Sequence, residues 1–463
     1  MGSARASSGA QSTNLCQFIW QYWPLLLGNV LEWYDFGIYS FLAPDIEKVF
    51  FHSSSISTWA GYTVTFLLRP FGGFLNGWLA DKYGRRTAVL ISILGMLLAT
   101  FGQGVLPTYL CCGDGWGTLG LVFLLLLRAL QGLSAGGELG PIVAYIGESA
   151  PPNRARAACG LLLASAGLGF LLANLLVTVV VRSLTPQDMA SWGWRIPFLV
   201  SIVPGSIALW GRNKLAESSN FVHFVTEHLE IEESKPPRMK LRDHALAVVV
   251  GFSATGALAV CYYSALWCPS YLKSQGMDQT LALLASCAFT GTVMISWVVW
   301  PVLNDLFCSF DPLIIMLAGG AILSVCSFPL FLLISSSVSF DALPIVWLAA
   351  FGLLVGFAGS HAYIFCADLF PVQLRALGFG MSCNLAFAVL GGTAPLIDAA
   401  ILDATHWAPG VGLYWALMSL MTTLVMAISV LWRRSGHLPS HLLQKGDTET
   451  NCDAKSLAGV AEV

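Results

Sequence analysis

The sequence Gly77-Trp-Leu-Ala-Asp-Lys-Tyr-Gly-Arg-Arg86 is a short charged segment between two long apolar runs. It holds three basic residues close together, Lys82, Arg85 and Arg86. Short loops rich in Lys and Arg remain on the cytoplasmic side of a membrane. The segment therefore predicts that the chain crosses a membrane on either side of it and that this loop faces the cytoplasm.

The composition supports a membrane protein. Of the 463 residues, 56% are hydrophobic and 11% are charged, whereas soluble domains carry about 25% charged residues. Apolar runs of about 20 residues, long enough to cross a bilayer as a helix, recur along the whole chain. We therefore expect an all-α integral membrane protein with the lipid bilayer as a partner. The net charge of −3 gives no indication of nucleic-acid binding.

Apolar length and helix-breaking residues divide the chain into twelve predicted spans. Their approximate ranges are 20–44, 57–80, 87–107, 118–147, 156–182, 194–211, 244–271, 279–303, 311–335, 342–366, 374–402 and 410–432. The longest polar stretch, 212–243, separates six spans from six. We expect an N-terminal six-helix bundle over 20–211, a cytoplasmic linker over 212–243 and a C-terminal six-helix bundle over 244–432. Cytoplasmic tails are expected at 1–19 and 433–463.

The basic residues fix the predicted orientation. With the amino terminus inside, most of them fall in the predicted cytoplasmic segments. The predicted external side of the membrane holds only Lys48, Arg182, Arg195 and Lys273. This bias follows the positive-inside rule and, with an even number of spans, places both termini in the cytoplasm. We expect a monomer in the plasma membrane.

The two predicted halves carry a similar short pattern. Pro152 and Arg156 follow the fourth span, and Pro371 and Arg375 follow the tenth at the same spacing, 219 residues later. Duplicated halves are typical of secondary transporters, which bind their substrate near the middle of the membrane between the repeats. Arg156 and Arg375 are candidate gating residues.

The first span contains two acidic residues on one helix face. At 100° per residue, Glu32, Asp35 and Tyr39 fall within about 60° of arc. Ionisable groups inside a membrane usually face the protein interior or a water-filled cavity and mark ion or substrate paths. Burial and mutual repulsion favour proton binding by at least one of the acids. Asp35 and then Glu32 are therefore the candidate proton-coupling residues, and the alternative is that one of them pairs structurally with an arginine.

The fourth span carries a second polar face. Gln131, Glu138 and Tyr145 lie within about 40° of one another, with Arg128 at the edge of that face. Arg128 could bind a substrate carboxylate through paired hydrogen bonds, or it could neutralise one of the acids of the first span. Both roles stay open. These four residues, together with Tyr39 of the first span, are candidate substrate-binding residues.

Glycines in the same span predict close packing. Gly132, Gly136 and Gly140 repeat every four residues, a spacing that lets a neighbouring helix approach closely. Arg69 in the second span is expected to extend toward the membrane surface or to form a structural ion pair.

Aromatic residues could hold a cationic group of the substrate, because aromatic faces attract quaternary ammonium ions. Tyr263 and Trp267 of the seventh span are the candidates. The cysteines show no metal-ligand spacing, and a disulfide within Cys111-Cys112 is conceivable. The chain contains no phosphate-binding Gly-x-x-x-x-Gly-Lys-[Ser/Thr] sequence, no HExxH and no CxxC. We expect neither an enzyme nor a bound cofactor or metal.

The opening segment resembles, position for position, the signature loop of the major facilitator superfamily. Four further stretches resemble the metabolite:proton symporters of that superfamily, in particular the bacterial proline/betaine carriers. They are Gly28-Asn-Val-Leu-Glu-Trp-Tyr-Asp-Phe36, Leu68-Arg-Pro-Phe-Gly-Gly73, Gln131-Gly-Leu-Ser-Ala-Gly-Gly-Glu138 and Trp192-Gly-Trp-Arg-Ile-Pro-Phe198. The resemblance covers roughly 20–435.

The resemblance implies two six-helix bundles that rock about a central cavity, with proton-coupled uptake of a small polar metabolite. It assigns gating of the cytoplasmic face to the loop with Asp81, Gly84, Arg85 and Arg86. It assigns the transport chemistry to Glu32, Asp35, Arg128 and Glu138. The corresponding second-half segment, Leu303-Asn-Asp-Leu-Phe-Cys-Ser-Phe310, keeps Asp305 but lacks the glycine and both arginines. This departure speaks against a symmetric gating role.

The same family also carries 2-oxoglutarate, citrate and shikimate. One arginine beside two acids suits a zwitterion better than a dianion, which would require a second cation. We therefore interpret the chain as a proton-coupled symporter of a proline- or betaine-like zwitterion. The alternatives are a proton-coupled organic-acid transporter, an uncoupled facilitator, and a transporter-like sensor that binds solute without moving it.

Overall fold

A computed structural model describes residues 15–83, 85–150, 154–213, 244–308, 310–340, 342–372, 374–438 and 440–442, and all regular structure in these ranges is helical. We call residues 15–213 the N-terminal half. Its helices are α1 (Leu15–Phe41), α2 (Ala43–Phe50), α3 (Ser55–Tyr83), α4 (Arg85–Gly104), α5 (Tyr109–Ala135), α6 (Leu139–Ser149), α7 (Ala155–Ser183), α8 (Pro186–Ser191), η2 (Gly193–Arg195), α9 (Ile196–Val200) and α10 (Ile202–Asn213).

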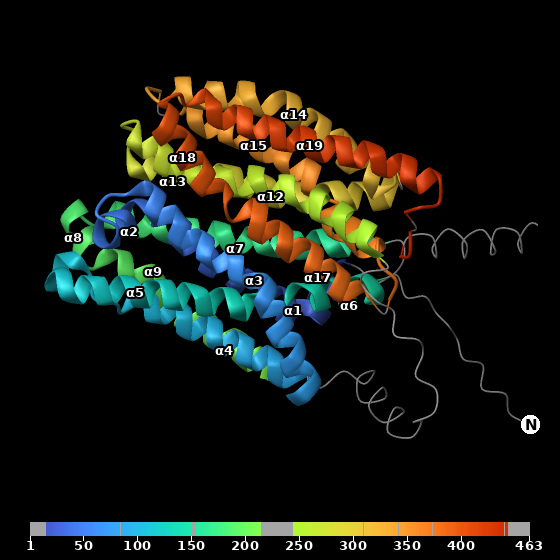
Figure 1. Cartoon of the computed structure of the whole chain (residues 1–463), viewed down its shortest axis with the longest axis horizontal. Coiled ribbons are helices and arrows are strands. Elements are labelled where there is room, and N and C mark those ends of the chain that lie inside the picture. The colour runs from blue at the N-terminus through green and yellow to red at the C-terminus, as the bar shows by residue number, and fades with distance from the viewer. Residues whose placement is uncertain are drawn as a thin grey trace, which may run out of the picture.

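We call residues 244–442 the C-terminal half. Its helices are α12 (Ala245–Ser274), α13 (Gln279–Leu303), η4 (Asn304–Cys308), α14 (Pro312–Ser336), α15 (Leu343–Gly359), α16 (Ala362–Asp368), α17 (Arg375–Ala386), η5 (Phe387–Gly391), α18 (Ala394–Thr405) and α19 (Pro409–Arg434). The long helices of both halves run side by side along one direction, with the C-terminal half above the N-terminal half in Figure 1. Helix α7 packs along α13, and α3 contacts η5 and α18, so these elements join the halves.

Nine helices in the described residues are long and apolar enough to cross a membrane. They begin at Tyr109, Ala155, Gly193, Ala245, Gln279, Pro312, Leu343, Arg375 and Pro409. Helices α1 and α3, of 27 and 29 residues, are not among them, and α4 contributes a shorter apolar run. The predicted all-α membrane fold is confirmed. The count of twelve spans and the division into two six-helix bundles stay predictions, and most of the predicted linker lies outside the described residues.

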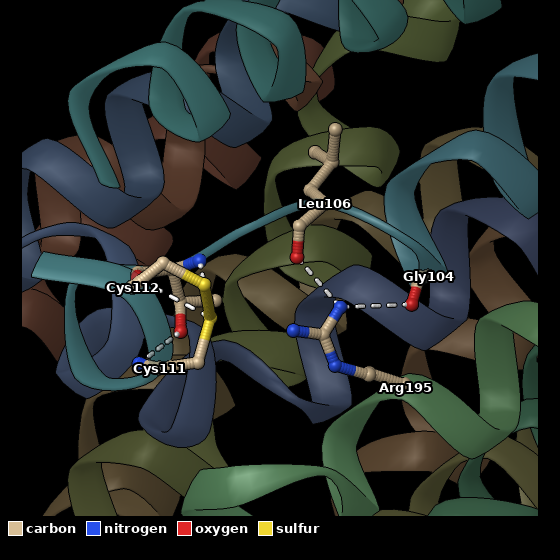
Figure 2. The surroundings of a disulfide bond; sticks show 6 residues. Gly104, Leu106, Cys111, Cys112 and Arg195 are labelled. Carbon is tan, nitrogen blue, oxygen red and sulfur yellow. Dashed lines mark hydrogen bonds between the residues drawn. A yellow bond between two sulfur atoms is a disulfide. The ribbon is translucent and has the colours of Figure 1, made fainter. Parts of the chain in front are cut away.

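Several polar contacts fix the start of α5 and the loop before it. Thr108 caps the helix by accepting a hydrogen bond from the Cys111 backbone N–H. The structure joins Cys111 and Cys112 in a disulfide between adjacent residues (Figure 2). In the same region Arg195 Nη1 donates to the carbonyls of Gly104 at 3.1 Å and Leu106 at 2.6 Å (Figure 2). These bonds tie η2 to the end of α4.

The predicted glycine spacing is confirmed as a packing device. A Cβ atom on Gly132 would lie 2.0 Å from the Thr65 carbonyl oxygen, and one on Gly136 would lie 1.9 Å from that of Arg69. Both oxygens belong to α3. A Cβ atom on Gly140 would lie 2.4 Å from the Ala376 oxygen of α17. The same ladder therefore brings α5 onto α3 and α6 onto the C-terminal half.

We expect Gly136→Ala to destabilise the protein, because the added methyl group must push α3 away from α5. Overpacking of this kind costs about 1–3 kcal/mol. The control is Gly291→Ala in α13, where a Cβ atom meets nothing within 4 Å. Thermal unfolding in detergent should show a lower Tm for Gly136→Ala alone. Equal Tm values for the two variants would contradict the packing role.

Candidate functional site

A cavity of about 60 Å³ lies between the two halves. The N-terminal half contributes residues of α1 and α7, and the C-terminal half contributes residues of α12, α13, α15, α16 and η5. Its described lining contains no charged side chain, and aromatic rings form much of its wall. These are Trp33, Phe170, Tyr262, Tyr263, Trp297, Tyr363 and Phe387. The cavity can therefore hold a small solute with apolar or cationic groups against ring faces.

A buried ion pair lies behind one wall of this cavity. Arg69 Nη2 is 2.7 Å from Glu32 Oε1, and both side chains are almost fully buried. Arg69 Nε also donates to Asn384 Oδ1 at 3.2 Å, and Asn384 Nδ2 donates to the Gly136 carbonyl at 2.7 Å. The network therefore links α1, α3 and α5 to α17 of the other half. This geometry favours the structural alternative for Glu32 and confirms an ion pair for Arg69.

Aromatic rings complete the surroundings of Arg69. Its guanidinium carbon lies 5.2 Å from the ring centroid of Trp33, 5.1 Å from that of Phe36 and 5.7 Å from that of Phe387. Trp33 and Phe387 also line the cavity. The buried cation and the cavity therefore share two rings, one from each half.

A second buried arginine occupies the N-terminal half. Arg128 Nη1 donates to Gln131 Oε1 at 2.7 Å, and Arg128 Nη2 donates to the Tyr62 carbonyl at 3.5 Å. The guanidinium carbon lies 4.3 Å from the ring centroid of Tyr39 and 5.5 Å from that of Tyr62. Arg128 is thus enclosed by rings and neutral acceptors.

Asp35 interacts with the Arg128 charge. Its own side chain is buried, and Thr100, Arg128 and Glu32 are the groups that act on its carboxylate. The Thr100 hydroxyl accepts from Gln131 Nε2 at 3.4 Å. Hydrogen bonds therefore connect Arg128 through Gln131 to Thr100, and both Thr100 and Arg128 act on the Asp35 carboxylate. Of the two roles left open for Arg128, this arrangement favours neutralisation of Asp35.

The predicted substrate-binding residues separate in space. Tyr263 lines the cavity, whereas Arg128, Gln131, Glu138, Tyr39, Tyr145 and Trp267 are not part of its lining. Trp267 stacks on Tyr271, with 5.1 Å between ring centroids. The Tyr39 hydroxyl donates to the Thr58 carbonyl at 2.9 Å. Direct substrate contact by these six residues stays a prediction.

The polar face of the fourth span extends over two helices, because α5 ends at Ala135 and α6 begins at Leu139. The residues between them keep right-handed helical backbone at Gly136 and Glu138. Glu138 is buried at the start of α6, and Tyr145 is 47% exposed with its ring against Tyr22. Arg128, by contrast, is fully buried, so the two ends of the predicted face have different surroundings.

One end of the interface between the halves is held by Asp305. Its Oδ1 atom accepts from Arg156 Nη1 at 3.1 Å, and its Oδ2 atom accepts from the Ala157 backbone N–H at 2.8 Å. The carboxylate thus lies at the N-terminus of α7, where the helix dipole favours negative charge. Asp305 contacts the other half although its segment lacks the glycine and arginines, so those residues are not needed for this link.

The other predicted gating residues lie near the same end. Arg375 begins α17, is buried and donates from Nε to the Ala367 carbonyl at 3.2 Å. Asp81 is in the last turn of α3, and Arg85 and Arg86 begin α4. Gly84 and these three side chains lie outside the described residues, so their gating role stays a prediction.

Residues 440–442 fold back onto the same end. Asp368 accepts hydrogen bonds from the Ser440 hydroxyl and from the backbone N–H groups of His441 and Leu442. Arg433 Nη2 also lies 3.0 Å from Asp368 Oδ2. This acid therefore anchors the segment that follows α19.

The halves also touch at the opposite end, near α2 (Figure 1). Thr63 Oγ1 donates to the Gly392 carbonyl at 2.9 Å, and Gln279 Nε2 donates to Asp45 Oδ2 at 2.9 Å. Contacts between the halves therefore flank the cavity at both ends. This is the arrangement expected for an occluded conformation.

Sequence reasoning missed Asp398, which is fully buried in α18 and accepts from Trp415 Nε1 at 3.2 Å. Its presence in a predicted span was the signal that could have identified it. It also missed most of the aromatic lining. Trp33, Trp297 and Phe387 are three among many aromatic residues, and their sequence context does not distinguish them.

Comparisons with known proteins agree with this architecture. A family model described as "Sugar (and other) transporter" matches residues 23–243. The chain is 31% identical over 440 residues to the α-ketoglutarate permease of Escherichia coli strain K12, covering 93% of this chain and 97% of that protein. It is 30% identical over 408 residues to the proline/betaine transporter of Salmonella typhimurium, covering 82% and 77% of the two chains. The chain belongs to the major facilitator superfamily.

Solved structures share the fold of this multi-pass membrane transporter. The crystal structure of a D-xylose-proton symporter aligns with a TM-score of 0.67 at 18% identity, covering 88% of this chain and 96% of that chain. The partially occluded, inward-open conformation of the Escherichia coli xylose transporter XylE also aligns with a TM-score of 0.67, at 16% identity.

The Glu32–Arg69 pair generates a stability prediction for this transporter. Glu32→Gln leaves the Arg69 charge buried without its anion, and breaking a buried pair costs about 3–5 kcal/mol. The double variant Glu32→Gln/Arg69→Gln removes both charges and should recover much of the loss. Asp311→Asn, which alters the partly exposed pair with Arg433 and keeps a capping residue, should cost about 1 kcal/mol or less.

Unfolding in detergent measures all of these variants. If the double variant is no more stable than Glu32→Gln, the two side chains do not act as a pair.

Proposed function

We propose that this transporter is a proton-coupled symporter of a small zwitterion of the proline or betaine type. In this proposal α1, α3 and α4 complete a set of twelve spans in two six-helix bundles, and both termini face the cytoplasm of a cell with the protein in its plasma membrane. The single observation that carries the proposal is a buried acid, Asp35, on which the buried Arg128 acts, two residues from a side chain that lines a cavity between the halves.

Asp35 is the proposed proton site. A deprotonated Asp35 offsets the positive charge of Arg128. A protonated Asp35 is neutral and leaves the Arg128 charge without that compensation. Glu32 is already paired with Arg69, so its charge is less free to change. Moving one charge across a membrane provides about 2.3 kcal/mol per 100 mV, or about 50-fold accumulation.

Helix α1 connects proton binding to the cavity. Trp33 lines the cavity, and Asp35 lies two residues further along the same helix. A change in the polar network that shifts α1 therefore changes the cavity wall. Arg156 and Asp305 then close the end of the interface near α7, together with Asp81, Gly84, Arg85, Arg86 and Arg375.

The cavity lining supports a zwitterion. A dianion would enter a cavity whose described lining has no charged side chain, and uncompensated buried charge is costly. A zwitterion supplies its own counter-charge, and its cationic group can lie against an aromatic ring.

Transport of an organic acid is the second candidate. It is favoured by the match to the α-ketoglutarate permease, which extends over 97% of that protein. Under this alternative Arg128 and Arg69 would supply the positive charge after a rearrangement that exposes them. An uncoupled facilitator would differ from both, because its solute accumulation would not depend on a proton gradient.

The test uses purified protein in liposomes with an inward proton gradient. We expect Asp35→Asn to abolish accumulation of radiolabelled proline or glycine betaine while counterflow exchange continues, because the variant keeps the cavity but cannot change its charge. The control is Asp403→Asn, an exposed acid of α18. Wild-type accumulation by Asp35→Asn would rule out Asp35 as the coupling site.

A further inference from the structure

We infer that Tyr262 and Trp297 form the carboxylate-binding end of the central cavity, and that the rings of Phe170 and Tyr263 receive the cationic group of the same solute. This inference rests on the proposed transport of a zwitterion and assigns the groups that bind it. It replaces Arg128 as the group that holds the substrate carboxylate.

Two hydrogen-bond donors in the cavity lining have no partner in the described protein. Tyr262 Oη and Trp297 Nε1 are both buried and unpaired, and their side chains are 6% and 8% exposed. Buried Tyr and Trp donors normally find a hydrogen-bond partner, and an unsatisfied one costs about 1–3 kcal/mol. Because both residues line the cavity, a bound solute is the partner that would satisfy them.

The two donors are held in a fixed relation. The rings of Tyr262 on α12 and Trp297 on α13 are stacked, with 5.5 Å between centroids and 27° between planes. Phe289 packs on Tyr262 at 5.6 Å. Two neutral donors carried on stacked rings suit the two oxygens of a carboxylate, which accepts hydrogen bonds only.

The cationic end is assigned by the position of Arg69. Its guanidinium already lies over Trp33 and Phe387, so a second cation on those rings would meet like charge. Phe170 and Tyr263 line the cavity, 6.4 Å apart between centroids, and in the described part of the chain no cation lies over their faces, although the Arg69 charge acts on Tyr263. Their faces can attract a substituted ammonium group.

The assignment places the solute across both halves. Phe170 belongs to α7 of the N-terminal half, whereas Tyr262 and Trp297 belong to the C-terminal half. Arg128 is covered by Gln131 and the Tyr39 ring and is not part of the lining. Binding at both ends of the solute would therefore stabilise the closed interface without direct contact to Arg128.

The experiment compares two probes that share a trimethylammonium group. Glycine betaine carries a carboxylate, whereas choline carries a hydroxyl instead. Tyr262→Phe and Trp297→Phe each remove one donor and keep a ring. Equilibrium binding to the purified full-length protein should show about 10-fold weaker glycine betaine binding for each variant, as expected for a hydrogen bond to a charged group. Choline should bind the wild type more weakly than glycine betaine does. In the two variants the dissociation constants of choline and glycine betaine should lie closer together, because only glycine betaine has a carboxylate that loses a hydrogen bond.

Tyr271→Phe is the matched control, because Tyr271 is a buried tyrosine of the same helix that does not line the cavity. It should leave glycine betaine binding unchanged. Ligand-free stability is a second measurement. Because the Tyr262 hydroxyl is unpaired without solute, Tyr262→Phe should leave the Tm unchanged or raise it.

The following results would overturn the inference. They are unchanged glycine betaine binding by both variants, equal binding of the two probes by the wild type, and a lowered ligand-free Tm of Tyr262→Phe, which would reveal a structural partner for its hydroxyl. A wild type that binds 2-oxoglutarate but neither glycine betaine nor proline would also overturn it. Proton coupling through Asp35 is measured separately, with whichever of these solutes the wild type accumulates. A failure of this inference can therefore be distinguished from a failure of the proposed coupling.

Discussion

The burial of two arginines in the N-terminal half is the constraint on which the rest of the structure depends. Removing a guanidinium from water costs several kcal/mol, which only close acceptors, rings or an anion can offset. Arg69 obtains a direct carboxylate from Glu32 and ring faces on three sides. Arg128 obtains neutral acceptors and rings, and it acts on the Asp35 carboxylate through its charge without a direct ion pair.

This difference separates a structural role from a proposed coupling role. The Arg69 network extends to Asn384 and so fixes the contact between the halves in the closed arrangement. The contacts of Arg128 stay within the N-terminal half, and the acid on which it acts can bind a proton. A transporter that changes conformation needs both a network that stabilises one state and a group whose charge changes between states. The cavity wall connects them, because Trp33 follows Glu32 and precedes Asp35 on α1.

Much of the fold could be predicted from the sequence because membrane helices are local features. The predicted spans 156–182 and 279–303 differ by at most one residue from α7 and α13. The glycine ladder was also readable, because its four-residue spacing directly encodes close approach between helices. The number of membrane spans is harder to establish. Polar residues inside α1 and α3 lower the mean hydropathy of these helices, which are not among the nine apolar helices of the described residues.

The site was less predictable because its contacts join distant segments. A helical wheel placed Glu32 and Asp35 on one face but could not show that Arg69 pairs with the first and Thr100 acts on the second. A wheel also could not show that Tyr145 is exposed and packs on Tyr22 while Arg128 is fully buried. The segment around Asp305 lacks the glycine and both arginines of the signature loop. Asp305 still contacts the N-terminus of α7, because that contact needs only a carboxylate and a backbone N–H group.

In the proposed transport cycle, solute and protons cross the membrane together. This coupling can be followed through the internal pH of liposomes that contain the wild-type protein and a pH-sensitive dye, with equal pH on both sides at the start and the membrane potential clamped. External glycine betaine or proline should acidify the interior as the solute enters, at a rate that rises with solute concentration. Entry of the same solute with no change in internal pH would contradict this coupling.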